Sequence, residues 1–333
     1  MNRRGYQWVR WDTLTHFEAC RAPPQKLSHR LVHYAGVQDR AMKIGLMLFA
    51  LAVADPVPVE VARSPTFTEG PVFDREGNLF FSHNHGIFKL TAKGVLTTWI
   101  KDSEAGFNGH KILPDGTHLV CASKKAAVWR LDTAGNFMGT ASTECDGKPL
   151  RAPNDITLDT QGGFYFTDPG GSREAPIGTV HYVGRDGITR LSFGGLRVPN
   201  GLVLAPAGKY LYVAETVPNR VLRFPVVTPG KLGPMEVFAV LPTREGHDAT
   251  PDGLTVDRKG NVYVAHLGTG YVLVLNDKGR LIHTWSGGMY DVSNLVFGGM
   301  ERNQLFVTGS VGHRSKTEGR VYRLDLAGIR DSW

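Results

Sequence analysis

Six polar residues recur along the chain, each just before a short apolar stretch, at intervals of 39 to 52 residues. These lead residues are Glu69, Asn108, Asn154, Asn200, Asp252 and Asn294. Each carries a carboxylate or amide oxygen, the kind of ligand that hard divalent cations take. A ring of these oxygens would suit Ca²⁺ best and Mg²⁺ or Mn²⁺ next. Zn²⁺ has less support, because neither His nor Cys occupies a lead position.

The same residue types also have a purely structural use. Asn and Asp can end a strand or bond the backbone of a neighbouring strand, and Asn108 and Asn294 are open to that interpretation. A buried glutamate is costly unless its charge is compensated. Glu69 together with Asp252 therefore favours metal binding.

The lead residues begin a repeated hairpin unit. The unit reads NGLVLAPAGKYLYVAE from Asn200 and DGLTVDRKGNVYVAH from Asp252. Gly, Asn and Asp in the turn tolerate positive φ, and the flanking residues are apolar, β-branched or aromatic, as in strands. Further strand-like segments follow each unit, such as residues 271–275 and 320–326. Each repeat therefore predicts four strands.

The chain contains six repeats of about 40 to 50 residues, and each repeat contains four predicted strands. This pattern predicts an all-β, six-bladed β-propeller. We expect the strand near Val57–Ala62 to complete the blade that ends near Leu326. In a propeller the innermost strands of all blades start at the same end of the central channel. The six lead residues should therefore converge at one mouth of that channel.

The composition excludes several other classes. The chain has 333 residues with 41% hydrophobic residues, and it contains no apolar run long enough for a multi-span membrane protein. The three cysteines indicate neither a disulfide framework nor a thiolate metal site. Residues 1–41 carry +4 of the net charge of +7, and Lys43 carries +1, which leaves +2 for residues 55–333. The main body therefore gives no support for nucleic-acid binding.

The N-terminal end has the form of a targeting segment. Residues 42–54 read MKIGLMLFALAVA, in which a positive charge, an apolar run and an A-x-A site precede Asp55. We interpret 42–54 as a signal peptide starting at Met42 and 1–41 as a non-native or disordered extension. The protein would then be periplasmic or secreted, without stable membrane insertion, and residues 55–333 would form the catalytic propeller. Otherwise the extension is genuine and the protein is cytoplasmic.

Several short motifs, in this order and spacing, resemble the regucalcin/gluconolactonase (senescence marker protein) family of metal-dependent lactonases. They are EGP at 69–71, PND at 153–155, YFTDP at 165–169, PNG at 199–201, LYVAET and NRVLRF within 211–224, PDG at 251–253 and FGG at 297–299. The resemblance extends from about Val57 to Asp325. It implies a six-bladed propeller that binds one divalent metal at the channel mouth and hydrolyses sugar lactones or related esters.

The resemblance also implies roles for individual residues. Glu69, Asn200 and Asp252 match the family's metal ligands, and Asn154 matches an asparagine that is a ligand or a substrate contact. Asp252 further matches the proposed general base. Arg151 lies near a family arginine that contacts substrate, although Ala152 and Pro153 intervene here.

The chemistry is consistent with these residue types. A cation can polarise a lactone carbonyl and acidify a water, and a neighbouring carboxylate can accept the proton. No Gly-x-Ser-x-Gly motif supports a serine hydrolase. Asn108, Asn294 and His247 are further candidates for substrate contacts. His110 is another, because strand alternation places it on the same side as Asn108. No second cofactor and no oligomeric state are indicated.

Two other functions remain open. A propeller enzyme similar to strictosidine synthase would share the PNG and LYVAET motifs, but its chemistry would not depend on a metal. A non-catalytic propeller that binds a ligand would lack a tight metal site and would expose a large apolar patch. The Glu69 and Asp252 pair favours the lactonase, with a small-molecule lactone as its partner.

Overall fold

The computed structural model describes residues 54–299, 302–313 and 318–326. These described residues form one compact unit. The predicted extension 1–41 and all of the predicted signal peptide except Ala54 lie outside the described residues. Within the described part, no helix has the length and apolar character needed to cross a membrane.

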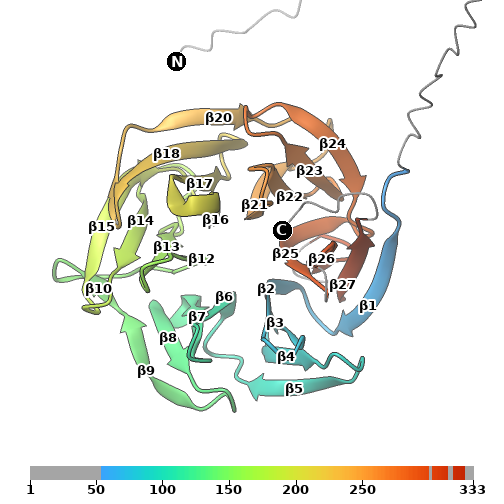
Figure 1. Ribbon diagram of the computed structural model, residues 1–333, viewed down its shortest axis with the longest axis horizontal. Helices are drawn as coiled ribbons and strands as arrows, with labels where there is room; N and C mark the ends of the chain where they lie inside the picture. The colour runs from blue at the N-terminus through green and yellow to red at the C-terminus, as the bar shows by residue number, and fades with distance from the viewer. Residues whose placement is uncertain (1–53, 300–301, 314–317, 327–333) are drawn as a thin grey trace, which may run out of the picture. The chain divides into compact units, whose positions relative to one another are not determined.

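The unit is a ring of six antiparallel sheets, which confirms the predicted six-bladed propeller (Figure 1). Blade 1 contains β2 (Thr68–Phe73), β3 (Leu79–His83), β4 (Gly86–Leu90) and β5 (Leu96–Lys101). Blade 2 contains β6 (Phe107–Ile112), β7 (His118–Ala122), β8 (Ala127–Leu131) and β9 (Phe137–Ser142). Blade 3 contains β12 (Ile156–Leu158), β13 (Phe164–Asp168), β14 (Gly178–Val183) and β15 (Thr189–Leu196).

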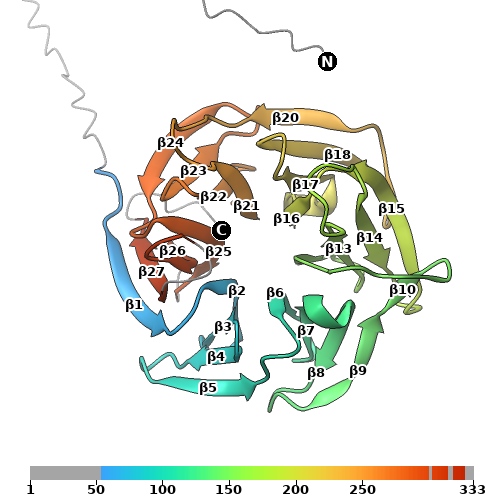
Figure 2. The same cartoon turned by 180° about the vertical axis from the view of Figure 1, so that it is seen from behind.

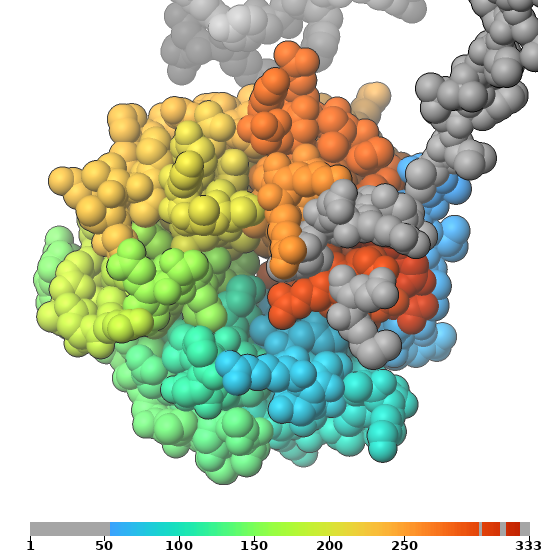
Figure 3. Space-filling model, in the orientation of Figure 1, coloured from blue at the N-terminus to red at the C-terminus, as the bar shows by residue number. Residues whose placement is uncertain are grey.

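The remaining blades continue the ring in chain order, as the space-filling view also shows (Figure 3). Blade 4 contains β16 (Pro199–Leu204), β17 (Tyr210–Glu215), β18 (Arg220–Thr228) and β20 (Glu236–Val240), and the short β19 (Lys231–Leu232) also pairs with β18. Blade 5 contains β21 (Thr250–Val256), β22 (Val262–Leu267), β23 (Tyr271–Leu275) and β24 (Leu281–Ser286). Blade 6 contains β25 (Asp291–Gly298), β26 (Gln304–Ser310), β27 (Gly319–Asp325) and β1 (Pro58–Ser64).

Blade 6 joins the two ends of the described chain. Its outermost strand, β1, pairs antiparallel with β27, for example Ala62 with Val321. This pairing confirms the prediction that a strand near Val57–Ala62 closes the ring, and it removes the free sheet edge that an open arrangement would leave.

The core lies between the blades rather than at the centre. One cluster of buried apolar side chains fills each of the six junctions between neighbouring blades. At the junction of blades 1 and 2, for instance, Phe80 and Ile87 pack against Phe107 and Val120. The apolar stretches of each repeat thus serve two junctions, one on each face of the sheet.

The two ends of the channel are built differently. At the turn end, Asp-x-x-Gly-Asn segments join the first strand of a blade to the second, and the Asp74 carboxylate accepts both the backbone and the side-chain N–H of Asn78. The 3-10 turn η2 (Pro206–Gly208) also lies there, toward the viewer in Figure 1. The opposite or mouth end, seen in Figure 2, carries η1 (Ser123–Lys125) and the small hairpin of β10 (Glu144–Cys145) and β11 (Lys148–Pro149).

Candidate metal centre

The lead residues all lie at the mouth end of the innermost strands. Glu69, Asn108, Asn200, Asp252 and Asn294 belong to β2, β6, β16, β21 and β25, and Asn154 directly precedes β12. In five blades the pairing with the second strand is interrupted at or beside the lead residue. Such interruptions free a side chain from the ordinary alternation of a strand and can aim it into the channel.

The lead residues of different blades meet across the channel. The Asn294 side-chain amide of blade 6 donates to Glu69 Oε2 of blade 1 at 3.2 Å. The same Nδ2 lies 3.5 Å from Asp155 Oδ2 of blade 3. Blades 6 and 3 face each other across a ring of six, so the channel is narrow at this end.

Three buried carboxylates concentrate negative charge here. Glu69, Asp155 and Asp252 are 8%, 3% and 6% exposed. Burial, and then the nearby Asp252 and Asp155 carboxylates, hold the pKa of Glu69 well above its usual range. Burial also raises the pKa of Asp155, although the Lys111 ammonium partly opposes this. Neither Glu69 nor Asp155 forms an ion pair with a basic residue of the described chain, so a cation would relieve their repulsion.

Three side-chain amides at the mouth are uncommitted. Asn108, Asn154 and Asn200 are half-buried, and their side chains form no hydrogen bond with another described residue, whereas their backbone carbonyls do. In the described part, no three His, Cys, Asp or Glu side chains are grouped closely enough to hold a metal by themselves. A cation would therefore need amide oxygens beside Glu69 and Asp252, a mixed oxygen set that suits Ca²⁺.

Glycines behind the lead residues allow the innermost strands to approach one another. A Cβ on Gly70 would overlap with Asn108 O, and a Cβ on Gly109 would overlap with Asp155. A Cβ on Gly201 would likewise overlap with Asp252 O, and one on Gly253 with the Asn294 side chain. In four of the six repeats, the residue after the lead residue is therefore a glycine because the next blade occupies the space.

Hydroxyl groups fix the backbone of the lead segments from the preceding blade. The donors are Ser and Thr side chains, and the acceptors are carbonyls at or beside the next lead residue. Five of the six junctions have such a bond: Ser82 to Asn108 O, Ser123 to Pro153 O, Thr167 to Asn200 O, Thr216 to Pro251 O and Ser293 to Thr68 O. The geometry of the site thus depends on contacts between blades.

Two acidic residues position the segments that lead into Asn154 and Asn200. Both Asp168 carboxylate oxygens accept backbone N–H groups, from Arg151 at 2.9 Å and from Ala152 at 2.7 Å. Glu215 does the same in blade 4, where its Oε1 accepts the Arg197 N–H at 2.8 Å. Each carboxylate therefore holds the chain three residues before a lead asparagine.

The mouth loops carry two of the predicted substrate contacts. Arg151 is exposed there, and its guanidinium donates to Ile177 O at 2.8 Å. His247 Nδ1 lies 2.7 Å from Gly268 O, so Nδ1 donates to this carbonyl. An ion pair between Arg173 and Asp248 links the His247 loop to the loop between β13 and β14, which also carries Ile177.

The structure places His110 in the core between blades 1 and 2. His110 is fully buried; its Nε2 lies 2.8 Å from His118 Nδ1, and its ring packs near Phe80 and Trp99. The pairing shift between Phe107 and His110 breaks the alternation that predicted a common side with Asn108. We therefore withdraw His110 as a substrate contact.

Sequence reasoning missed Asp155, which lies beside Glu69 and Asn294 in the channel. A signal was present, because Asp155 occupies the position that is glycine in four other repeats. A carboxylate in place of a space-saving glycine indicates a specific use. Lys111, whose charge favours the ionised form of Asp155, was missed as well.

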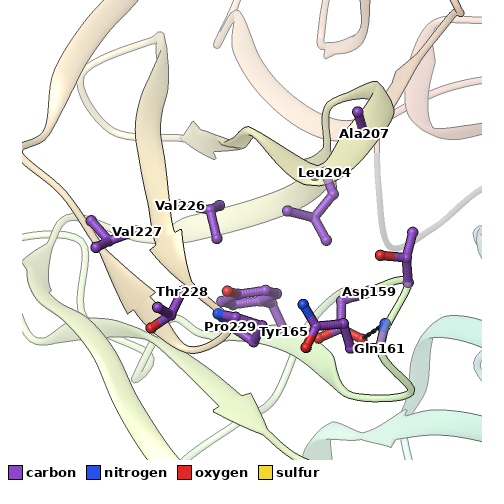
Figure 4. Close-up of a pocket in the computed structure, with 11 residues that line it drawn as sticks. Asp159, Gln161, Tyr165, Leu204, Ala207, Val226, Val227, Thr228 and Pro229 are labelled. Carbon is purple, nitrogen blue, oxygen red and sulfur yellow. Dashed lines mark hydrogen bonds between the residues drawn. The ribbon is translucent and has the colours of Figure 1, made fainter.

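Two hollows at the turn end do not involve the lead residues. One of about 180 Å³ lies between blades 3 and 4 and is lined by Asp159, Tyr165, Leu204 and Val226, among others (Figure 4). Another of about 470 Å³ lies between blades 1 and 2 and includes His118. Both are separate from the carboxylates of the mouth.

Comparison with known proteins adds independent evidence. Residues 67–311 match the family described as the SMP-30/Gluconolactonase/LRE-like region. Lactonase drp35 of Staphylococcus epidermidis is 35% identical over 263 residues, which cover 74% of this chain and 77% of that protein. A gluconolactonase structure from Xanthomonas campestris matches with a TM-score of 0.69 and 25% identity, over 80% of this chain and 89% of that one. A calcium-binding regucalcin from Agrobacterium tumefaciens shares the fold, with a TM-score of 0.70 and 21% identity over 81% and 93%.

Proposed function

Because the chain belongs to the SMP-30/gluconolactonase/LRE-like family, we propose that it is a metal-dependent hydrolase that opens a sugar lactone or a related cyclic ester. The observation that carries this proposal is the meeting of Glu69, Asp155 and Asn294 from three blades, with Asp252 close enough to affect the pKa of Glu69. Glu69, Asn154, Asn200 and Asp252 would hold the cation. Ca²⁺ is the expected ion, with Mg²⁺, Mn²⁺ and Zn²⁺ as alternatives.

The residues of the mouth have separate roles in the reaction. A bound divalent cation would supply polarisation of the ester carbonyl and a lowered pKa of water. Asp252 accepts the proton of the water that attacks the carbonyl carbon. As the ring C–O bond breaks, Asp252 returns this proton to the leaving oxygen, so the product is a hydroxy acid. Arg151 and His247 contact polar groups of the substrate from the mouth loops, and Asn108 contacts them from the ring of lead residues.

The decisive experiment compares metal-free and reloaded protein. Hydrolysis of gluconolactone is followed by acid release after chelation and after addition of Ca²⁺, Mg²⁺, Mn²⁺ or Zn²⁺, with Asp252→Ala alongside. We expect activity to disappear on chelation, to return with metal and to be absent in Asp252→Ala. Activity that survives chelation would contradict the metal mechanism. Metal binding without hydrolysis would contradict the choice of substrate alone.

We further propose that the protein acts in the periplasm or outside the cell, with Met42 as the start of a signal peptide. The support is the sequence pattern of residues 42–54. N-terminal sequencing of the mature protein tests this proposal. A chain that begins before Met42 would contradict it and would favour a cytoplasmic protein.

A further inference from the structure

The Asn294 carboxamide has a fixed orientation. Its Oδ1 accepts the backbone N–H of Leu295 at 2.8 Å, so the NH₂ group must point the other way. There it faces two carboxylates, Glu69 Oε2 at 3.2 Å and Asp155 Oδ2 at 3.5 Å. The side chain is buried, at 6% exposure. The carboxamide therefore turns its NH₂ group, and not its oxygen, toward the two carboxylates.

The bond from Asn294 makes the two carboxylate oxygens of Glu69 unequal in their hydrogen bonding. Glu69 Oε2 also accepts the Gly70 N–H at 3.1 Å, so two N–H donors occupy this oxygen. Oε1 accepts no hydrogen bond from another described residue. A glutamate has three rotatable side-chain bonds, so holding Glu69 in one conformation costs conformational entropy. The hydrogen bonds from the two donors offset this cost. They hold the carboxylate so that Oε1 is the free oxygen.

Asp155 holds the other side of the amide. Its Oδ1 accepts the Ile156 N–H at 2.8 Å, which orients the carboxylate, and its Oδ2 faces Asn294 from the opposite blade. A hydrogen bond to a charged acceptor is stronger than one between neutral groups. Two carboxylate acceptors, from blades 1 and 3, therefore keep the amide of blade 6 in place.

We propose that Asn294 is a positioning residue, not a metal ligand, and that it holds Glu69 with Oε1 directed at the cation while Asp155 anchors the amide. This inference rests on the proposed metal centre. It assigns different roles to two lead residues of the same type. Asn108 occupies the same position in blade 2, but its side chain forms no hydrogen bond with the described residues, so it provides a matched control.

The test measures Ca²⁺ affinity by calorimetry in Asn294→Ala, Asn108→Ala, Glu69→Gln and the double variant Glu69→Gln with Asn294→Ala. Loss of a residue that orients a metal ligand typically weakens affinity about 10- to 100-fold. We expect a loss in this range for Asn294→Ala and a much smaller one for Asn108→Ala. In the Glu69→Gln background, Asn294→Ala should weaken binding no further, because the residue acts through Glu69.

A second readout follows the coordination itself. Tb³⁺ replaces Ca²⁺, and its luminescence lifetimes in H₂O and D₂O count the waters bound to the ion. Asn294→Ala and Glu69→Gln should raise this number equally, while the double variant should match either one. Asn294→Ser, which keeps an oxygen near the Leu295 N–H but is too short to reach both carboxylates, should behave as Asn294→Ala does and serves if the alanine variant does not fold.

The outcomes separate the two proposals. If the wild-type protein binds neither Ca²⁺ nor Tb³⁺, the metal centre itself is wrong. If it binds both, but the losses of Glu69→Gln and Asn294→Ala multiply in the double variant, Asn294 acts independently of Glu69 and this inference fails while the metal centre stands. An unchanged Ca²⁺ affinity in Asn294→Ala would also overturn it.

Discussion

The turn end and the mouth end of the propeller are held by hydrogen bonds of different sequence separation. At the turn end, the Asp257 carboxylate accepts the N–H groups of Lys259 and Asn261, which are only two and four residues away. At the mouth end, the Thr68 hydroxyl reaches Arg320 O, 252 residues away. Turn geometry can thus form locally, whereas mouth geometry exists only when the whole ring is assembled.

Acidification should have the largest effect on the free energy of unfolding. It tests whether histidines are equally buried at the two ends. Burial lowers the pKa of His118, toward the turn end, and of His266, at the mouth end, to about 4 in each case. The unfolded chain binds these protons near pH 6.5, so stability is lost as the pH falls from 6.5 towards 4. Each histidine contributes up to about 1.4 kcal/mol per pKa unit. Urea unfolding at a series of pH values should show a steep loss.

Single substitutions show how much of this loss of stability comes from the histidine at each end. His118→Gln and His266→Gln should each flatten the pH dependence between 6.5 and 4, and by similar amounts. A flat profile in the wild-type protein would show that the histidines titrate normally. A change in only one variant would show that the two ends are buried differently.

The next largest effect should come from a single methyl group at the mouth end. In Gly253→Ala the added Cβ would overlap with Asn294, and we expect a loss of about 3 kcal/mol in the free energy of unfolding together with a loss of Ca²⁺ binding. Gly260→Ala is the matched change at the turn end of the same blade. Its φ of +84° costs about 1 kcal/mol, and the added Cβ would make only an ordinary contact with Asp277 Cβ at 3.7 Å. Equal losses in the two variants would contradict the role of close strand approach.

A smaller effect should separate stability from metal binding. Thr167 donates to Asn200 O at 2.7 Å and accepts the Asp155 N–H. Thr167→Val should therefore cost about 1 to 2 kcal/mol of stability and also weaken Ca²⁺ binding. Asp257→Ala removes the local bonds of a turn, so it should lower stability but leave Ca²⁺ affinity unchanged. Denaturation and calorimetry on both variants measure the difference; weakened Ca²⁺ binding in Asp257→Ala would count against it.

Removal of an exposed ion pair should have the smallest effect on stability. Arg173 and Asp248 lie 3.6 Å apart at the mouth, and both side chains are at least half exposed. Arg190 and Asp186 form a comparable exposed pair at the turn end. Arg173→Ala and Arg190→Ala should each change stability by less than about 1 kcal/mol. A larger loss for Arg173→Ala would mean that the loop link supports the mouth.

This difference between the ends explains what the sequence could predict. The repeated turns and strands are local, so the six blades and their closure by the strand near Val57–Ala62 could be predicted. The position of Glu69, Asn200 and Asp252 at one mouth followed from the geometry of the ring. The role of Asn294 could not be predicted, since its partners Glu69 and Asp155 lie on other blades.

Two failures have specific physical causes. Asp155 was not predicted because the repeat is defined by its first residue, whereas the Asp155 carboxylate reaches the channel from the second position. His110 was misplaced because a strand was assumed to alternate without interruption. The break in pairing beside Asn108 instead leaves His110 between two blades, against His118.

The closure of the ring by β1 also has a consequence for synthesis. The Asn294 amide and the Glu69 carboxylate are 225 residues apart, and β1 cannot pair until β27 has left the ribosome. A nascent chain that has completed five blades therefore carries unpaired sheet edges and an incomplete ring of oxygens. The full affinity for a cation would appear only when the last strand has closed the ring, so tight binding would mark a chain that has been completed and closed.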